Sequence, residues 1–579
     1  MSTEKVYLKG NVLAEPLFNQ WYAWSSLIAP ATSAMFVANS HLKIMQSFVN
    51  APDVHINALK NPAMRGGPFI GHDASRVKDV RELIERTTKE QAEVLEFAAA
   101  VKTLSEMLET EAANGTSLEP LYSKVPESLR GYIELVYDLN NNPSIRFIEG
   151  LLYKSRYYRE SSQSIALSLC EHDERPFVLS TPQLPDDDHV QVRLPFTSPA
   201  LDELFKMKLE PQPLEYIREL LGIEHGDRFA TFFTTEAPHR GERYAGDGVR
   251  IRYYGHACIL IETRNTSIMI DPVISHQNSN GIDRYSYNDL PDRLDYVLIT
   301  HNHQDHCMFE TLLQLRQRIG TIIVPKSAGG VLADPSLKLV LKNIGFRQVE
   351  EIDEMETIEV EDGTLTGLPF LGEHADLNIR TKMAHLVTLK GKSILCAADS
   401  NNIEPRLYEN VHELVGDVDV VFLGMECDGG PLSWLYGPLL TKPIGRKQDQ
   451  SRRLNGSNHE RGMGIINCLR PSQVYVYAMG QEPWLTYLTS IVYTETSRPI
   501  VESNGLVAEC RSRGIESERL YGHKEIELEA GNATRFATTT SEAFGAEAVD
   551  AEPVNAELMD AEPADAEPAD AEPAEQVAA

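Results

Sequence analysis

The chain has 579 residues, more than a single hydrophobic core usually supports, so two or three domains are expected. The formal net charge is −31, and removing the twelve Asp and Glu residues that follow position 540 still leaves −19. An acidic surface repels phosphate backbones, which argues against a nucleic-acid partner. The seven cysteines form no CxxC pair, and neither an apolar leader nor a membrane-length apolar run is present. These features predict a cytoplasmic protein with reduced thiols and no membrane partner.

Residues 1–245 are predicted to form a mixed α+β domain. The stretch VKDVRELIERTTKEQAEVLEFAAAVKTLSEMLETEAA, from Val77, has apolar residues at helical spacing, as does PLEYIRELLGI from Pro213. Short strand-like pieces such as HVQVRLPF lie between them. The stretch EAPHRGERYAGDG is a plausible linker to the next domain.

Residues 246–530 alternate predicted strands with predicted helices. The strands are rich in β-branched and aromatic residues: RYYGHACILIE, TSIMIDPVI, LDYVLIT, TIIVP, MAHLVTLKG, SILCAAD, DVDVVFLGM and QVYVYAM. Helical stretches between them are FETLLQLRQRI, EPRLYENVHELV and ERGMGIINCL. The pattern predicts an α/β domain in which sheets pack face to face with helices outside.

The last segment, residues 531–579, consists mainly of Ala, Glu, Asp, Pro and Thr and repeats DAEPA. Little of it could be buried, and proline interrupts helices, so a disordered acidic tail is predicted. A solvating role is favoured over a role in docking.

A dense group of metal-ligating side chains follows the apolar run LDYVLIT, in the stretch THNHQDHC. His301 and His303 are two residues apart, so both point the same way on an extended backbone. Asp305 and His306 follow as the chain turns towards a helix. One pair can hold one metal ion while the next pair holds a second. A polar loop with coincidental histidines is the weaker explanation at this density.

The HxHxDH pattern at a strand end resembles the signature of the metallo-β-lactamase superfamily. Other features of that superfamily recur in order over roughly residues 250–485. YYGHACILIE resembles its early strand, and SIMIDPV resembles the strand whose aspartate, here Asp271, braces the site. AADS offers Asp399 as the residue that bridges two metals. The resemblance implies an αββα sandwich with a dinuclear metal site.

The remaining ligand of the first metal distinguishes two chemistries. A hydrolase of this fold normally has a histidine there, and the matching stretch is LPFLGEHADL, where Glu373 and His374 are adjacent. Neighbours on an extended segment point to opposite sides, so only one can easily ligate. With His374 the site would suit zinc, whereas Glu373 would add a hard oxygen donor that favours iron or manganese.

The N-terminal sequences EPLFNQWYAWSSLIAPATSAMF, HLKIMQSFV and GGPF look like the domain joined to this fold in the diiron β-hydroxylases of the chloramphenicol-biosynthesis type. That family acts on amino acids tethered to carrier domains of nonribosomal peptide synthetases. The resemblance implies that His301, His303 and Glu373 hold one iron, and that Asp305, His306 and a later histidine hold the other. Asp399 would bridge the two irons.

The later histidine has more than one candidate because the end of the last central strand, YAMGQEPW, contains none. His459, which opens a helix just before that strand, is the preferred candidate. His523 is the alternative, whereas His412 lies in the middle of a predicted helix and is expected on the surface.

Several other polar residues receive lesser roles. His256, in YYGHAC, is expected to be structural or to support a ligand, and His385 to be structural or to face the substrate. Thiolate ligation by Cys307 is not needed if oxygen and nitrogen ligands are complete. Glu426 and Asp428, in a glycine-rich loop, could border a substrate channel or form a plain turn.

The expected function is therefore a non-haem diiron oxygenase in antibiotic biosynthesis that β-hydroxylates a carrier-tethered amino acid, with O2 as co-substrate and an external electron donor. Residues 1–245 would supply carrier docking and a homodimer interface. The alternative is a dinuclear zinc metallohydrolase, similar to a lactonase or phosphodiesterase, with His374 as ligand. A non-catalytic scaffold is the third hypothesis, and the nearly complete ligand set weighs against it.

Overall fold

The structure is a computed structural model that describes residues 4–112, 115–224, 227–276, 278 and 281–531. The predicted acidic tail, beyond Gly531, lies outside the described residues. Among the described residues, no helix is long and apolar enough to cross a bilayer. The seven cysteines are all free thiols, and six of them are buried.

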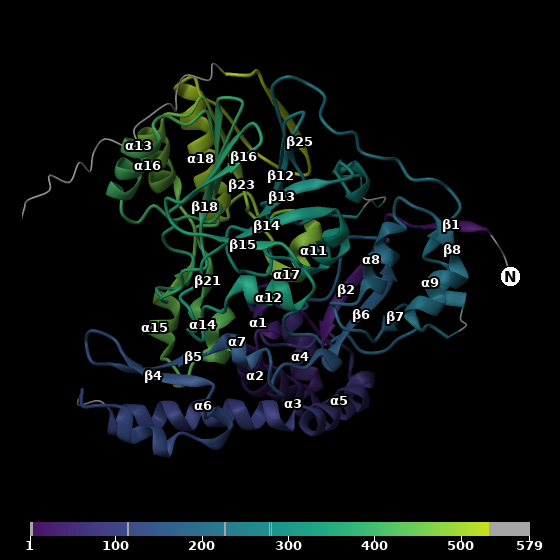
Figure 1. Cartoon of the computed structure of the whole chain (residues 1–579), viewed down its shortest axis with the longest axis vertical. Coiled ribbons are helices and arrows are strands. Elements are labelled where there is room, and N and C mark those ends of the chain that lie inside the picture. Colours follow the sequence, from purple (N-terminus) through teal and green to yellow (C-terminus); the bar gives the residue numbers. More distant parts are fainter. Residues whose placement is uncertain (1–3, 113–114, 225–226, 277, 279–280, 532–579) are drawn as a thin grey trace, which may run out of the picture. The chain divides into compact units, whose positions relative to one another are not determined.

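Two seven-stranded sheets form the centre of the predicted α/β region (Figure 1). In the first sheet the strand order is β15 (Val349–Ile352), β14 (Ile319–Pro325), β13 (Leu294–Leu298), β12 (Ser267–Ile270), β11 (Ile259–Glu262), β10 (Val249–Tyr253) and β25 (Lys524–Leu528). In the second it is β16 (Thr357–Val360), β17 (Gly363–Leu368), β18 (Ala384–Leu389), β19 (Lys392–Cys396), β20 (Val420–Gly424), β23 (Gln473–Tyr477) and β24 (Glu516–Arg519). Strands β12 to β15 run parallel, as do β19, β20, β23 and β24.

The core between the sheets follows from alternation along each strand. Ile259 and Ile261 of β11 pack inward against residues of the second sheet such as Val387 and Phe422, whereas Leu260 faces the other way. The outer face of the second sheet is covered by α13 (Arg406–Val415), α16 (His459–Leu469) and α18 (Arg498–Ser512). The expected αββα sandwich is therefore present.

The outer face of the first sheet packs against α11 (Phe309–Leu315), α12 (Leu337–Asn343) and the N-terminal half in one continuous core. A buried ion cluster reinforces this contact: Arg175 lies 2.9 Å from Glu310 of α11 and also pairs with Glu15 of β2. Although burial opposes ionisation, Arg175 and His276 lower the pKa of Glu310 to about 2. Residues 4–531 thus form one compact unit, although their sequence patterns change near residue 246.

The N-terminal half is mixed α+β, as predicted. Its strands are β1 (Lys5–Leu8), β2 (Val12–Phe18), β3 (Trp21–Tyr22), the hairpin β4 (Ile133–Tyr137) and β5 (Pro143–Phe147), β6 (Gln163–Leu169), β7 (Val190–Val192), β8 (Gln212–Pro213) and β9 (Phe233–Thr234). Its helices include α1 (Ser25–Ile28), α2 (Pro30–Phe36), α3 (Leu42–Asn50), α4 (Pro52–Leu59), α5 (Val77–Glu90), α6 (Ala92–Glu111), α7 (Glu149–Leu152), α8 (Pro199–Lys206), α9 (Leu214–Leu221) and α10 (Asp227–Ala230). In Figure 1, α3, α5 and α6 lie together at one end, in purple and blue.

Two sequence expectations change in detail. The long helix from Val77 breaks at Gln91, between α5 and α6, where the buried Gln91 side chain donates to Ser162 Oγ at 2.7 Å. The stretch RYYGHACILIE forms two strands, because Gly255 and His256 turn the chain with φ of 106° and 52°. That turn brings His256 towards the metal-ligating cluster.

Candidate metal centre

The predicted ligands meet at one edge of the sandwich, where parallel strands of both sheets end. His301 to His306 follow β13, Glu373 lies between β17 and β18, and Asp399 follows β19. The side chains of His301 and His306 are fully buried, and those of Glu373 and Asp399 are nearly so. Six of the seven predicted ligands are thus brought together.

Three overlapping groups have ligand atoms that all lie within 4.8 Å of one another: His301, His303 and Glu373; His301, His306 and Asp399; and His256, Asp305 and His306. Glu373 Oε1 lies 3.2 Å from His303 Nδ1. Asp399 Oδ2 lies 3.1 Å from His306 Nε2 and 3.8 Å from His301 Nε2, the position expected of a bridging carboxylate.

The donor set fits a pair of cations. His301 Nε2, His306 Nε2 and Asp399 Oδ1 are buried and make no hydrogen bond within the described residues, although buried polar atoms rarely remain unbonded. Burial and then the neighbouring Asp399 raise the pKa of Glu373, so keeping this carboxyl ionised requires positive charge beside it. Burial and neighbouring imidazoles lower the pKa of His301, which therefore stays neutral, as metal ligation requires.

Asp271 orients two of the imidazoles, as the resemblance to the metallo-β-lactamase superfamily predicts. Its carboxylate accepts from the Thr300 backbone N–H at 2.7 Å, from the Thr300 hydroxyl, and from His306 Nδ1 at 2.8 Å. His301 Nδ1 in turn lies 3.0 Å from Thr300 Oγ1. Both rings therefore hold a proton on Nδ1 and present the Nε2 lone pair to the cluster.

The neighbours Glu373 and His374 have separate environments. Gly372, Glu373 and Ala375 adopt φ of 83°, 64° and 51°, a tight turn that directs Glu373 to the cluster. Tyr436 Oη lies 2.8 Å from His374 Nδ1 and 3.0 Å from His303 Nε2. His303 can donate to the Tyr436 oxygen while the Tyr436 hydroxyl donates to His374, which leaves His303 Nδ1 free to ligate. No sequence pattern pointed to Tyr436.

His459 is not brought to this cluster. It begins α16 on the outer face of the second sheet, where its Nε2 lies 2.8 Å from Glu509 of α18. His523 is exposed beside the Asp283 carbonyl, and His412 pairs with Asp417. His459 was chosen because a helix that begins near a strand end can face the site. The structure contradicts this premise, because the His459 side chain faces α18.

His256 stands where the later histidine was sought. Its Nε2 lies 3.4 Å from Asp305 Oδ2, and its ring lies 5.0 Å from that of His306. The Gly480 backbone N–H donates to His256 Nδ1 at 3.2 Å. Because Nδ1 accepts, Nε2 is the ring nitrogen that faces Asp305, where it makes no hydrogen bond within the described residues. His385, by contrast, bonds the Ile299 carbonyl at 2.9 Å and is structural.

A cavity of about 260 Å³ opens onto the cluster. Its metal side is formed by His256, His303, Gln304, Asp305, Glu373 and Asp399, and its other walls include Arg65, Gly66, Glu426, Trp434, Leu454, Met479 and Ile491. Arg65 and Gly66 come from the N-terminal half, and Trp434 Nε1 donates to the Gly66 carbonyl at 3.0 Å. Glu426 borders the cavity as expected, whereas Asp428 is exposed and does not line it. Both halves of the chain therefore build the site.

The N-terminal half also supports the loop of the HxHxDH motif. Ser25 Oγ donates to Asn302 Oδ1 at 2.7 Å, and Tyr22 donates to Glu310 at 3.2 Å. Cys307, which follows the motif, belongs to none of the three ligand groups. The WYAWSS sequence thus has a structural purpose that its composition did not indicate.

Comparison with known proteins identifies the family. Residues 7–238 match the N-terminal domain of diiron non-haem β-hydroxylases, and residues 266–429 match the β-lactamase superfamily domain. The 4-amino-L-phenylalanyl-[CmlP-peptidyl-carrier-protein] 3-hydroxylase of Streptomyces venezuelae is 40% identical over 90% of this chain and 99% of its own. The crystal structure of CmlA, a diiron β-hydroxylase from that organism, superposes with a TM-score of 0.84 over 91% of this chain and all of its own, at 37% identity.

Similarity to hydrolases is more limited. A metal-dependent hydrolase of Listeria innocua is 24% identical over 30% of this chain and 72% of its own. Two observations decide between the hydroxylase and hydrolase families. The match to the hydroxylase spans both halves of the molecule, and Glu373 shares a ligand group with two histidines. The chain belongs to the family of diiron non-haem β-hydroxylases.

Proposed function

We propose that this enzyme hydroxylates the β-carbon of an amino acid held as a thioester on a peptidyl carrier domain of a nonribosomal peptide synthetase. The observation that carries the proposal is similarity over nearly the whole length to a relative named for that reaction. Hydroxylation consumes one O2, two electrons and two protons, and yields one hydroxyl group and one water. The electrons come from an external donor.

We assign His301, His303 and Glu373 to one iron, Asp305 and His306 to the other, and Asp399 to both. A donor set of two histidines and one carboxylate is typical of non-haem iron oxygenases. The chemistry that two irons supply when bound is activation of dioxygen, for which zinc, having no accessible redox change, is unsuited. The zinc-hydrolase alternative loses support because Glu373, and not His374, shares a ligand group with His301 and His303.

His256 replaces His459 in our assignment, as a positioning residue and not as a ligand. Its Nε2 faces the Asp305 carboxylate at 3.4 Å, while its Nδ1 is occupied by the Gly480 N–H. Asp305, His306 and Asp399 then remain as the protein ligands of the second iron. Asp305 and Asp399 also line the cavity, so small molecules could reach an iron held by this group.

The cavity wall orients the substrate. Trp434, Leu454, Met479 and Ile491 offer apolar surface for the amino-acid side chain and exclude water from the reacting carbon. Burial raises the pKa of Glu426 to about 7, so a positive group beside it would favour its ionised form. We assign it to the α-ammonium group of the substrate, which lies one bond from the α-carbon and two from the β-carbon.

Metal content and product mass test the function. Protein produced without added metals will contain about two irons per chain. Reduced enzyme exposed to ¹⁸O2 with an aminoacyl-carrier substrate will give a product in which one ¹⁸O atom has been inserted. A protein that carries two zinc ions, contains no iron and hydrolyses the thioester would contradict the proposal.

The role of His256 is tested by paired substitutions. His459→Ala will leave the iron content unchanged, because its side chain contacts Glu509 and not the cluster. His256→Ala will weaken binding of one iron by about tenfold or more, the range expected when a group that orients a ligand is lost.

His256→Gln separates positioning from ligation, since the Gln amide N–H can face Asp305 as the imidazole Nε2 does. We expect it to retain most of the iron affinity, measured by competition with a chelator. Equal losses for the Gln and Ala variants would identify His256 as a ligand.

The expected homodimer and cytoplasmic location remain predictions. Free cysteine thiols agree with a reducing compartment. The solvent-exposed apolar side chains Val54, Leu59 and Met64 of the N-terminal half offer a surface for self-association.

A further inference from the structure

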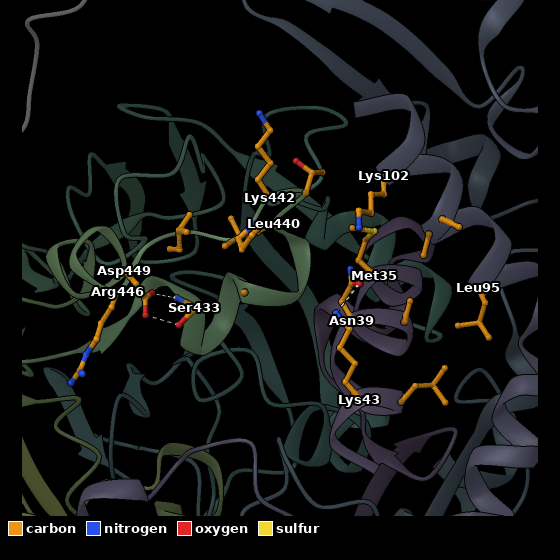
Figure 2. Close-up of a pocket in the computed structure, with 18 residues that line it drawn as sticks. Met35, Asn39, Lys43, Leu95, Lys102, Ser433, Leu440, Lys442, Arg446 and Asp449 are labelled. Atoms are coloured by element: carbon orange, nitrogen blue, oxygen red, sulfur yellow. Dashed lines mark hydrogen bonds between the residues drawn. The ribbon is translucent and has the colours of Figure 1, made fainter. Parts of the chain in front are cut away.

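A groove of about 850 Å³ separates the N-terminal helices from a segment inserted after β20 (Figure 2). One wall consists of α2, the π-helical segment Val37–His41, the start of α3 and α6. The other consists of α14 (Leu432–Tyr436) and the chain from there to α15 (Arg446–Ser451). This groove is distinct from the cavity that opens onto the metal ligands.

The groove is basic in a strongly acidic protein. Lys43 and Lys102 lie on one wall, and Lys442 and Arg446 on the other (Figure 2). The single carboxylate among its lining residues, Asp449, is engaged by the Ser433 N–H and hydroxyl at 2.7 and 2.8 Å.

Three of these four cations form no ion pair with a described carboxylate. Lys442 pairs with Glu109 at 2.7 Å, but no ion pair within the described residues involves Lys43, Lys102 or Arg446. All three side chains are exposed. Such a cluster favours an acidic partner, although the chain as a whole carries a net charge of −31.

Beneath the cations the groove is apolar. Leu42, Leu95, Leu440 and Ile444 are half-buried on its surface, and Met35 lies deeper. An apolar floor flanked by charge is the form that accepts an amphipathic helix. The groove therefore suits a helix with apolar residues on one face and carboxylates at its margins.

Helix α14 connects the groove to the metal centre. Ser433 lines the groove, Trp434 lines the metal cavity, and Tyr436 bonds His303. Pro431, directly before the helix, also lines the cavity. A partner seated in the groove would thus contact one side of a helix whose other side faces the metal ligands.

We propose that this groove docks the carrier domain through an acidic helix. The inference rests on the proposed function, because a carrier domain delivers its substrate on a phosphodiester-linked arm and must bind close to the cavity. Carrier domains are generally acidic, so the global field of this protein opposes their approach. The exposed cations of the groove provide the local attraction that the rest of the surface lacks.

Charge reversal in the groove tests the proposal. The double variant Lys102→Glu, Arg446→Glu will raise the Kd for an aminoacyl-carrier domain by about tenfold, since repulsion replaces attraction on both walls. Lys89→Glu, Lys447→Glu is the matched control. It makes the same charge change at exposed positions that do not line the groove, and Lys447 is adjacent to Arg446.

The same variants should turn over a free aminoacyl-pantetheine thioester at the wild-type rate, because that substrate needs no docking. Carrier binding equal to that of the control, or an equal loss with the pantetheine substrate, would overturn the proposal. If no enzyme hydroxylates either thioester, the proposed function fails, whereas a Kd that responds only to the groove variant still supports docking.

Zero-length coupling of amines to carboxylates identifies the occupant. Mass spectrometry should find Lys43 or Lys102 joined to carboxylates of the carrier domain. Coupling only to residues 541–579 of this chain, or only to a second copy of it, would show that the groove serves another purpose.

Discussion

Replacing Glu373 by alanine will remove one iron from the centre and abolish hydroxylation. Glu373 supplies the anionic donor beside His303, at 3.2 Å, and no other described carboxylate lies in that ligand group. We expect iron affinity at this position to fall by more than about 100-fold, beyond the loss caused by removing a group that only supports a ligand. Iron per chain and the rise in Tm on adding iron measure the effect, since metal stabilises only a folded site.

His374→Ala is the control for this prediction. It removes a buried imidazole and its contact with Tyr436, which costs about 3 kcal/mol of stability, but should leave the iron content unchanged. Glu373→Gly provides a second check. It should lose iron as the alanine variant does, yet be more stable without metal, because φ of 64° strains alanine by about 1 kcal/mol relative to glycine. Retention of iron by Glu373→Ala, with loss in His374→Ala, would restore the hydrolase hypothesis.

Asp271→Asn will weaken iron binding at the site of Asp305 and His306, although no ligand is replaced. The asparagine amide can still accept from the Thr300 N–H, but its NH2 group then faces the Nδ1–H of His306. Two donors cannot face each other, so the imidazole must move its proton to Nε2 and can no longer ligate through that atom. Iron affinity should fall about 10- to 100-fold, and the free energy of unfolding by about 2 kcal/mol.

Asp334→Asn is the matched control for Asp271→Asn. Asp334 is also fully buried and accepts from the backbone N–H groups of Ala328, Arg380 and Thr381, but it belongs to no ligand group. Its substitution should cost comparable stability in denaturant titrations while leaving iron affinity unchanged. Equal losses of iron in both variants would mean that Asp271 acts only through the fold.

Much of the metal centre could be predicted from local sequence. The HxHxDH motif follows a buried parallel strand and precedes a helix, and strand, turn and helix are all short-range structures. Asp271 and Asp399 likewise follow apolar strands, β12 and β19, whose ends lie at the same edge. Polar ligands that directly follow a strand can thus be predicted wherever the sequence shows the strand clearly.

The polar edge strands were harder to recognise. β16, β24 and β25 consist mainly of exposed or half-buried residues and include glutamates, and β17 combines leucine with glycine and threonine. Their strand conformation depends on pairing with β18, β23 and β10 more than on intrinsic propensity. The sequence therefore indicated the inner strands of each sheet and not all the outer ones.

The sequence by itself determined the fold class, the two-metal motif and, through family resemblance, the preference for Glu373. Only the tertiary structure decided which of the candidate side chains face the metal centre. A turn at positive φ directs Glu373 to the cluster and leaves His374 with Tyr436, and the β10–β11 turn brings in His256 while α16 carries His459 away to α18. These outcomes depend on contacts between segments far apart in the chain, which local patterns do not encode.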